Sequence, residues 1–163
     1  MKNLIIIRHA KSSWEAPLKD IDRPLSQKGI IDAHLVAKKC IKYLPSNFII
    51  WSSTAKRASE TALIFSQTIL YPVESIVYKE DLYTFELNKL ENVIKSCADD
   101  FENVILFGHN EAITNFVNKF GDIMINNVPT AGFVFIQFDA DSWKNIKNGK
   151  IKKIIFPKKT IKI

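Results

Sequence analysis

The sequence predicts an α/β fold with three layers (αβα), in which helices cover both faces of a mainly parallel central sheet. Through most of the 163-residue chain, short apolar runs alternate with amphipathic segments of helical period. Strands that alternate with helices form βαβ units, in which the strands are parallel. The C-terminal third instead holds two apolar runs joined by a short connection, which predicts antiparallel strands at the sheet edge near the C-terminus.

The first apolar run, NLIIIRH at residues 3–9, is nearly continuous in Ile and Leu. A central parallel strand that is buried on both faces requires such a run. The support is weaker for the run at residues 74–83. In chain order, the further strands are expected at residues 47–53, 74–83, 103–110, 131–139 and 149–159.

Helices are expected in the segments between these runs, at residues 26–43, 55–70, 85–98 and 111–120. Ser26 is the expected N-cap of the first helix, because its side chain can accept a hydrogen bond from the first turn. The spacing of apolar residues predicts that this helix buries one face, made of Ile30, Ala33, Ala37, Ile41 and Leu44. His34 is expected to be partly buried beside Ile30. The third helix is expected to bury Leu90, Val93, Ile94 and Cys97.

Length and composition are typical of one globular domain spanning residues 1–163, with 47% hydrophobic and 25% charged residues. No apolar run reaches the ~18 residues that a membrane span requires, and the N-terminus lacks a signal-peptide pattern. We therefore expect a cytoplasmic protein, a monomer, with no membrane partner. Cys40 and Cys97 form no C-x-x-C pair, so they are interpreted as buried, reduced thiols.

The net charge of +6 is concentrated in the C-terminal tail. Residues 144–163 contain eight lysines and no acidic residue, which leaves 15 basic and 17 acidic groups in residues 1–143. Two explanations of such a tail are equally good: a solvated edge strand, and a surface that binds the phosphates of a nucleic acid. Because the body of the chain carries a net charge of −2, no nucleic-acid partner is expected.

Polar residues follow three of the predicted strands at the point where each strand ends. The first strand ends in Arg8-His9, the second leads into a helix whose first turn holds Arg57, and the fourth ends before His109. Ligands bind at the carboxyl ends of the strands of an open parallel sheet. If the three strands are central and parallel, two arginines and two histidines therefore converge at one edge of the sheet.

This set of residues favours phosphoryl chemistry. A pair of arginines can clamp a phosphoryl group through charge-assisted hydrogen bonds, and a histidine can form a covalent intermediate. Two guanidinium groups would lower the pKa of a neighbouring histidine and keep its lone pair free. A second histidine at the rim would donate to the phosphoryl oxygens if it is protonated. The three histidines of the chain show no metal-ligand spacing, so neither a metal nor a cofactor is expected.

Four ordered blocks resemble those of the histidine phosphatase superfamily, which includes the phosphoglycerate mutases. They are RHAKSSW (8–14), RPLSQKG (23–29), SSTAKRASETA (52–62) and GHN (108–110). The resemblance implies a phosphoglycerate mutase-like fold and assigns His9 as the nucleophile that becomes phosphohistidine. It makes Arg8, Arg57 and His109 the rest of a catalytic, phosphate-binding set. Glu60 and Thr61 match a further part of the pattern and are interpreted as supports for the helix and for Arg57.

The short chain and its first two blocks are most similar to the SixA-like phosphohistidine phosphatases. Two residues differ from the family pattern: Ala10 replaces a glycine, and Glu15 stands where mutase-like members have asparagine. Thr84 occupies the position of the general-acid glutamate of the mutase branch, so no acid is assigned. A missing acid favours a substrate with an easily released leaving group, such as the imidazole of protein phosphohistidine.

Two other functions stay open. A phosphatase for a small phosphomonoester is one. Such enzymes are expected to carry a larger cap, whereas the long connection near the site here is residues 10–25. This connection, with Trp14 and Pro17, is expected to form one wall of the site. A non-catalytic phosphate- or phosphoprotein-binding module is the other. His9 argues against the module, because simple binding needs only a hydrogen-bond donor at that position.

Overall fold

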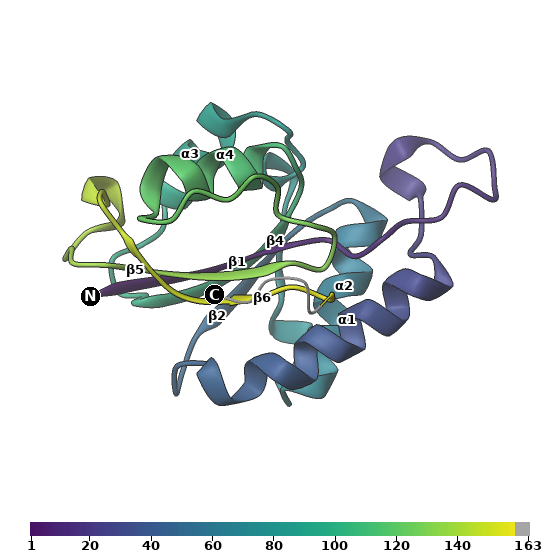
Figure 1. Ribbon diagram of the computed structural model, residues 1–163, viewed down its shortest axis with the longest axis horizontal. Helices are drawn as coiled ribbons and strands as arrows, with labels where there is room; N and C mark the ends of the chain where they lie inside the picture. Colours follow the sequence, from purple (N-terminus) through teal and green to yellow (C-terminus); the bar gives the residue numbers. More distant parts are fainter. Residues whose placement is uncertain (159–163) are drawn as a thin grey trace.

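The structure of the protein, a computed structural model, describes residues 1–158. A six-stranded sheet forms the central layer, and helices cover both of its faces (Figure 1). The strands are β1 (Lys2–Arg8), β2 (Ile49–Ser53), β3 (Val77–Lys79), β4 (Asn103–Gly108), β5 (Phe133–Phe138) and β6 (Lys150–Ile155). The α-helices are α1 (Gln27–Cys40), α2 (Lys56–Thr68), α3 (Leu87–Lys95) and α4 (Ala112–Phe120). Short 3-10 helices are η1 (Asp20–Asp22), η2 (Ile41–Tyr43), η3 (Val73–Ser75), η4 (Glu80–Leu82) and η5 (Trp143–Asn145).

The strand order in the sheet is β3-β2-β4-β1-β5-β6. β3, β2, β4 and β1 run parallel to one another, whereas β5 is antiparallel to β1 and β6 is antiparallel to β5. The predicted fold class is therefore confirmed, including the antiparallel strands near the C-terminus. β1, β4 and β2 are neighbours, so their carboxyl ends lie side by side.

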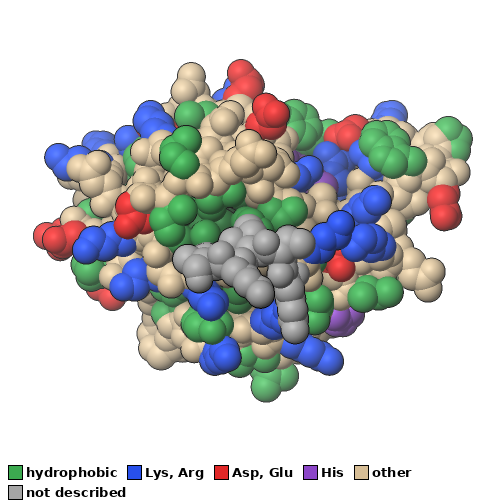
Figure 2. Space-filling model, viewed as in Figure 1, with side chains coloured by type: hydrophobic (Ala, Val, Ile, Leu, Met, Phe, Trp, Pro, Cys, Tyr) green, Lys and Arg blue, Asp and Glu red, His purple; other side chains and the backbone are tan. Residues whose placement is uncertain are grey.

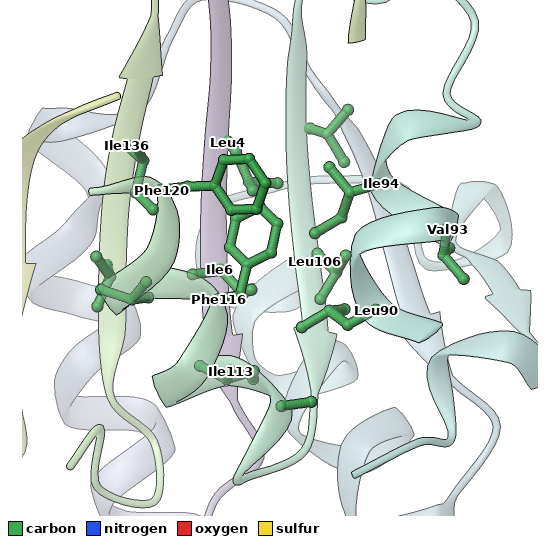
Figure 3. Close-up of a cluster of buried hydrophobic side chains, with 14 of the residues drawn as sticks. Leu4, Ile6, Leu90, Val93, Ile94, Leu106, Ile113, Phe116, Phe120 and Ile136 are labelled. Carbon is green, nitrogen blue, oxygen red and sulfur yellow. The ribbon is translucent and has the colours of Figure 1, made fainter. Parts of the chain in front are cut away.

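Successive residues of β1 point to opposite faces of the sheet, and both faces are covered. Leu4 and Ile6 belong to the core beneath α3 and α4, together with Phe116 of α4 (Figure 3). Ile5 and Ile7 belong to a second core on the side of α1 and α2. The apolar run of β1 is thus explained by burial on both faces.

Ser26 caps α1 as predicted, since its side chain accepts a hydrogen bond from the backbone N–H of Gly29. The predicted buried face of this helix is partly wrong. Ile30 and Ile41 are 42% and 49% exposed, and His34 is also exposed. The buried stripe instead consists of small or compact residues that allow close packing, namely Gly29, Ala33, Val36, Ala37 and Cys40.

The remaining elements follow the prediction with shorter bounds. The weakly supported strand at 74–83 contains only the three residues of β3 and continues into η4. The inner face of α3 is as predicted, and Cys40 and Cys97 are buried free thiols. The last residue of the predicted strand at 149–159 lies outside the described residues.

Within residues 1–158, no helix has both the length and the apolar character needed to cross a membrane.

Candidate active site

The polar residues predicted to converge do so at the carboxyl ends of β1, β4 and β2. Arg8 lies opposite Gly108 in the register of β1 and β4, so His9 and His109 follow adjacent strand ends. Their ring centroids are 5.2 Å apart. Arg57 reaches the same place from the first turn of α2, which follows β2.

His9 is held in one orientation by the backbone of the next residue. Its Nδ1 lies 2.6 Å from the carbonyl oxygen of Ala10, and because a carbonyl only accepts, Nδ1 must carry the proton. Nε2 is then the unprotonated nitrogen, and its lone pair accepts a hydrogen bond from Arg57 Nε. The N–H of Ala10 donates to Thr61 Oγ1 at 3.0 Å, which fixes the carbonyl in turn. These contacts use only backbone atoms of Ala10, so they do not depend on the glycine that the family pattern has here.

The pKa of His9 is lowered to about 4. Burial is the largest cause, because the ring is only 8% exposed and the charged form loses its hydration. The hydrogen bond to Ala10 acts in the opposite direction, and the charges of Arg57, Arg8 and Arg23 lower the pKa further. The predicted influence of the guanidinium groups is thus present, but it is secondary to burial. His9 is neutral at physiological pH.

Arg57 is a buried cation whose Nε donates a hydrogen bond to the lone pair of His9 Nε2 at 3.3 Å. Thr61 supports it as predicted, since Oγ1 donates to the Arg57 carbonyl at 2.7 Å. The predicted support of Arg57 by Glu60 is not what the structure shows. Glu60 Oε1 instead accepts from the backbone N–H of Leu25 at 2.8 Å and ties the β1–α1 loop (residues 9–26) to α2.

Arg8 extends from the end of β1, and its Nη1 donates to the Val128 carbonyl at 3.0 Å. Its Nε is buried and has no hydrogen-bond partner. Burial and the nearby charge of Arg57 lower the pKa of Arg8. A buried, unpaired donor on a cation is costly unless a ligand meets it, and an oxyanion is the ligand that would.

His109 is 2% exposed, so it does not lie at the rim as expected. Burial, followed by the proximity of His9 and Arg57, lowers its pKa to about 3, so the condition of a protonated ring is not met and His109 is neutral. Its Nε2 lies 2.8 Å from Ser53 Oγ, which already accepts from the N–H of Ala55. In the tautomer in which the Ser53 hydroxyl donates to Nε2, the buried Nδ1 carries an N–H and has no partner within residues 1–158. In that tautomer His109 offers a neutral donor.

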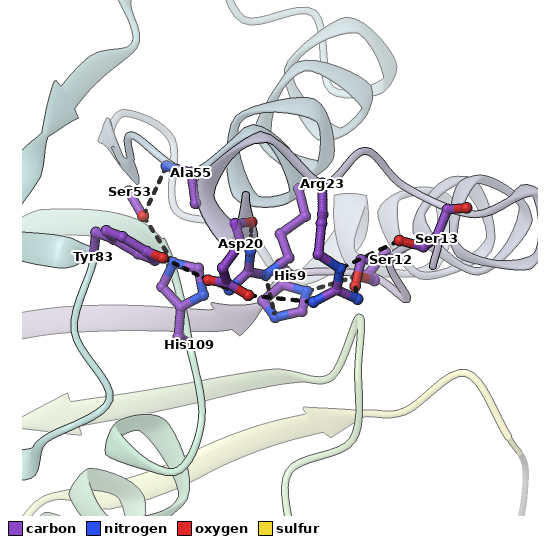
Figure 4. Close-up of polar contacts among 11 residues, drawn as sticks. His9, Ser12, Ser13, Asp20, Arg23, Ser53, Ala55, Tyr83 and His109 are labelled. Atoms are coloured by element: carbon purple, nitrogen blue, oxygen red, sulfur yellow. Dashed lines mark hydrogen bonds and ion pairs between the residues drawn. The ribbon is translucent and has the colours of Figure 1, made fainter. Parts of the chain in front are cut away.

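Three residues that sequence reasoning did not assign complete the site. Asp20 of η1 contacts Arg57, Arg23 and Tyr83 through its carboxylate (Figure 4). Burial raises its pKa, but the hydrogen bonds from Tyr83 and Arg57 outweigh that effect and lower the pKa to about 2. Arg23 was the only one with a sequence signal, because it begins the RPLSQKG block. Asp20 and Tyr83 lie in segments without regular periodicity.

The β1–α1 loop forms one side of the site through Arg23. The guanidinium of Arg23 lies 3.1 Å from the centroid of the Trp14 ring, and its Nη2 contacts Ser12 Oγ. Trp14 itself is 77% exposed, so its role as a wall is indirect, through the stacked arginine. In the space-filling view, a histidine surface is visible in a hollow beside Lys and Arg side chains, next to the protruding loop (Figure 2).

The site combines a nucleophilic nitrogen with an excess of positive charge. Arg8, Arg23 and Arg57 supply three guanidinium groups and Asp20 one carboxylate, so the net formal charge is +2 with both histidines neutral. An arrangement of this kind suits a phosphoryl dianion that is attacked by His9 Nε2. Within residues 1–158, no group of His, Cys, Asp and Glu side chains has the arrangement of a metal site.

The model of the histidine phosphatase superfamily (branch 1) matches residues 4–93, more than half of the chain. The chain belongs to the histidine phosphatase superfamily. An uncharacterized chloroplastic protein of Arabidopsis thaliana is 29% identical over 154 residues, which cover 88% of this chain and 69% of the plant protein. An uncharacterized protein of Mycobacterium tuberculosis is 26% identical over 153 residues, covering 88% of this chain and 93% of its own length.

Solved structures show that the fold is SixA-like. A protein assigned as SixA from Nakamurella multipartitia has a TM-score of 0.80 at 18% identity and covers 96% of both chains. One from Agrobacterium tumefaciens has a TM-score of 0.76 at 23% identity, covering 94% of this chain and 97% of its own. The protein histidine phosphatase SixA complexed with tungstate has a TM-score of 0.79 at 16% identity, and the match covers 95% of this chain and 97% of that chain. Family and fold support phosphatase activity.

The neutral, buried histidines predict a specific loss of stability in mild acid. In the unfolded chain a histidine titrates near 6.5, whereas His9 titrates near 4 and His109 near 3 in the folded protein. Between these values the unfolded state binds more protons, so the free energy of unfolding is largest above about pH 6.5 and decreases as the pH falls towards 4. The loss from His9 alone is on the order of 3 kcal/mol. Urea unfolding at pH 7.5, 6 and 5 measures it.

His9→Asn should flatten this pH dependence, because asparagine does not titrate. His34→Asn is the matched control, since His34 is exposed. Equal slopes for wild type and His9→Asn would contradict the assignment of a buried, neutral His9.

Proposed function

We propose that this protein is a metal-independent phosphatase that removes the phosphoryl group from protein phosphohistidine through a covalent intermediate on His9. The observation that carries the proposal is the His9–Ala10 contact of 2.6 Å, which directs the lone pair of Nε2 into a site with three guanidinium groups. In this proposal Arg8, Arg57 and His109 bind the phosphoryl oxygens.

In the first step, the lone pair of His9 Nε2 attacks phosphorus, and the bond between phosphorus and the substrate nitrogen breaks. The bonding electrons remain on the imidazole that leaves. The Nδ1–H of His9 keeps its hydrogen bond to the Ala10 carbonyl, so the positive charge that forms on the ring is stabilised where it appears. Arg8 Nε is a buried donor without a partner in residues 1–158, and so is His109 Nδ1 in the tautomer in which Ser53 donates to Nε2; both suit the oxygens of the transferred group.

In the second step, water attacks the phosphorus of the intermediate from the side where the first leaving group departed. The bond between phosphorus and Nε2 breaks, its electrons return to Nε2, and the water proton passes to solvent. The products are inorganic phosphate and neutral His9. The low pKa of His9 favours this neutral form and therefore makes the ring a good leaving group.

Two features favour phosphohistidine as the substrate. The carboxylate in the network around His9 is that of Asp20, which is ionised and cannot donate a proton. Thr84, at the position of the mutase acid, is 7% exposed and accepts a local hydrogen bond from Glu86. A site without a general acid suits a leaving group that departs easily. The similarity to the protein histidine phosphatase SixA supports the same choice.

A small phosphomonoester is the second candidate. The mycobacterial glucosyl-3-phosphoglycerate phosphatase shares the fold with a TM-score of 0.67, below the 0.76–0.80 of the SixA structures. The larger similarity to SixA supports phosphohistidine over this candidate.

Replacing His9 with Ala should lower turnover by more than about a thousandfold, because the nucleophile is lost while the apolar residues of β1 remain. Rapid quenching should trap acid-labile, base-stable phosphate on the wild type and none on the variant. His34→Ala, an exposed change away from the site, is the control and should behave as wild type. Substantial activity of His9→Ala would reject the covalent mechanism.

Turnover of a phosphohistidine-carrying protein should exceed that of small alkyl phosphomonoesters, because the site lacks a proton donor for an alkoxide. The measurement compares kcat/KM for both substrate types, with and without EDTA. Chelation should leave both values unchanged. A preference for an alkyl phosphomonoester would instead support the second candidate.

A further inference from the structure

Asp20 lies at the centre of the hydrogen-bond network of the site, although it is not part of the family motif blocks quoted above. It belongs to η1 in the β1–α1 loop, and its side chain is 45% exposed. Its backbone carbonyl and its carboxylate both bind Arg57. Through the same carboxylate it also contacts Arg23 and the hydroxyl of Tyr83.

The contacts with Asp20 occupy one edge of the Arg57 guanidinium. Nη1 donates to the Asp20 carbonyl at 2.7 Å, and Nη2 donates to Asp20 Oδ2 at 2.9 Å. A guanidinium is planar, so fixing the two terminal nitrogens fixes the direction of the remaining edge. That edge carries Nε, which faces His9 Nε2 at 3.3 Å. Asp20 thus determines which edge of Arg57 faces the nucleophile.

The Asp20 carboxylate also connects three different segments around the nucleophile. Asp20 Oδ1 accepts from Arg23 Nη1 at 3.3 Å, within the β1–α1 loop. Asp20 Oδ2 accepts from Tyr83, whose ring centroid lies 5.3 Å from that of His109. One negative charge therefore holds a cation on α2, a cation on the loop and an aromatic ring beside the second histidine.

Asp20 has little reason to be present for stability alone. Ion pairs that involve an exposed carboxylate contribute little to the free energy of unfolding. Arg57, in contrast, is a buried cation with a long side chain, and small displacements of such a group reduce catalysis strongly. The main effect of Asp20 is therefore to orient the Arg57 guanidinium.

We propose that Asp20 is a positioning residue for phosphoryl transfer, which holds the Arg57 guanidinium with its Nε edge directed at His9 and at the phosphoryl group. This role rests on the proposed phosphatase function. It predicts that Asp20 acts mainly through Arg57, so that its removal has a much larger effect while Arg57 is present than when only the contacts with Arg23 and Tyr83 remain. It also predicts weaker binding of a phosphate-like anion, a property that needs no turnover.

The test is a double-mutant cycle of Asp20→Ala and Arg57→Ala, read both as kcat/KM and as the Kd of tungstate by calorimetry. Asp20→Ala should reduce kcat/KM about 10- to 100-fold and weaken tungstate binding. In the Arg57→Ala background the same change should have less than about a threefold effect on either quantity. Asp20→Asn, which keeps the shape but loses the charge, should lie between wild type and Asp20→Ala.

Asp22→Asn is the matched control, because Asp22 is an exposed acid of the same 3-10 helix, and it should leave both quantities unchanged. Equal effects of Asp20→Ala with and without Arg57 would overturn the proposal. So would tighter tungstate binding by Asp20→Asn, which would show that the carboxylate competes with the phosphoryl group. Accumulation of phosphoenzyme in Asp20→Asn would also overturn it, since Asp20 would then act on the attacking water. The tungstate arm remains decisive even if the proposed reaction fails, because it does not depend on turnover.

Discussion

The hydrogen bond between His9 Nδ1 and the Ala10 carbonyl is the interaction on which the rest of the site depends. At 2.6 Å it determines which ring nitrogen carries the proton and therefore which one holds the lone pair that can attack phosphorus. The carbonyl is fixed because the N–H of Ala10 binds Thr61 on α2. A backbone group is a reliable partner for this purpose, since substitution of the side chain leaves it unchanged.

The sheet explains how this interaction comes to lie among so many charges. β1, β4 and β2 are adjacent and parallel, so the residues that follow them meet at one edge. The strands are buried on both faces, and the site lies at their carboxyl ends, next to the core. The same burial lowers the pKa of His9 to about 4 and keeps it neutral. The burial that packs the strands therefore also keeps the proposed nucleophile His9 neutral.

The sequence was sufficient to predict the fold and the convergence of the four central side chains, because each lies at the end of a strand of clear apolar pattern or shortly after it. It was not sufficient for Asp20, which lies in a short 3-10 helix, or for Tyr83, which follows another, because the positions of these segments depend on tertiary contacts. The expected place of His109 at the rim was wrong for a related reason. A strand end looks accessible in a sequence, whereas the folded chain leaves this residue 2% exposed and close to the Arg57 and Arg8 guanidinium groups.

The position of the phosphoryl group on His9 tests the central claim most directly. The phosphoenzyme can be trapped in base and examined by 15N and 31P NMR, which distinguish the two ring nitrogens. The Ala10 contact predicts phosphorus bonded to Nε2, with the proton remaining on Nδ1. Phosphorus bonded to Nδ1 would contradict this account, because that nitrogen would then have to lose the hydrogen bond that orients the ring.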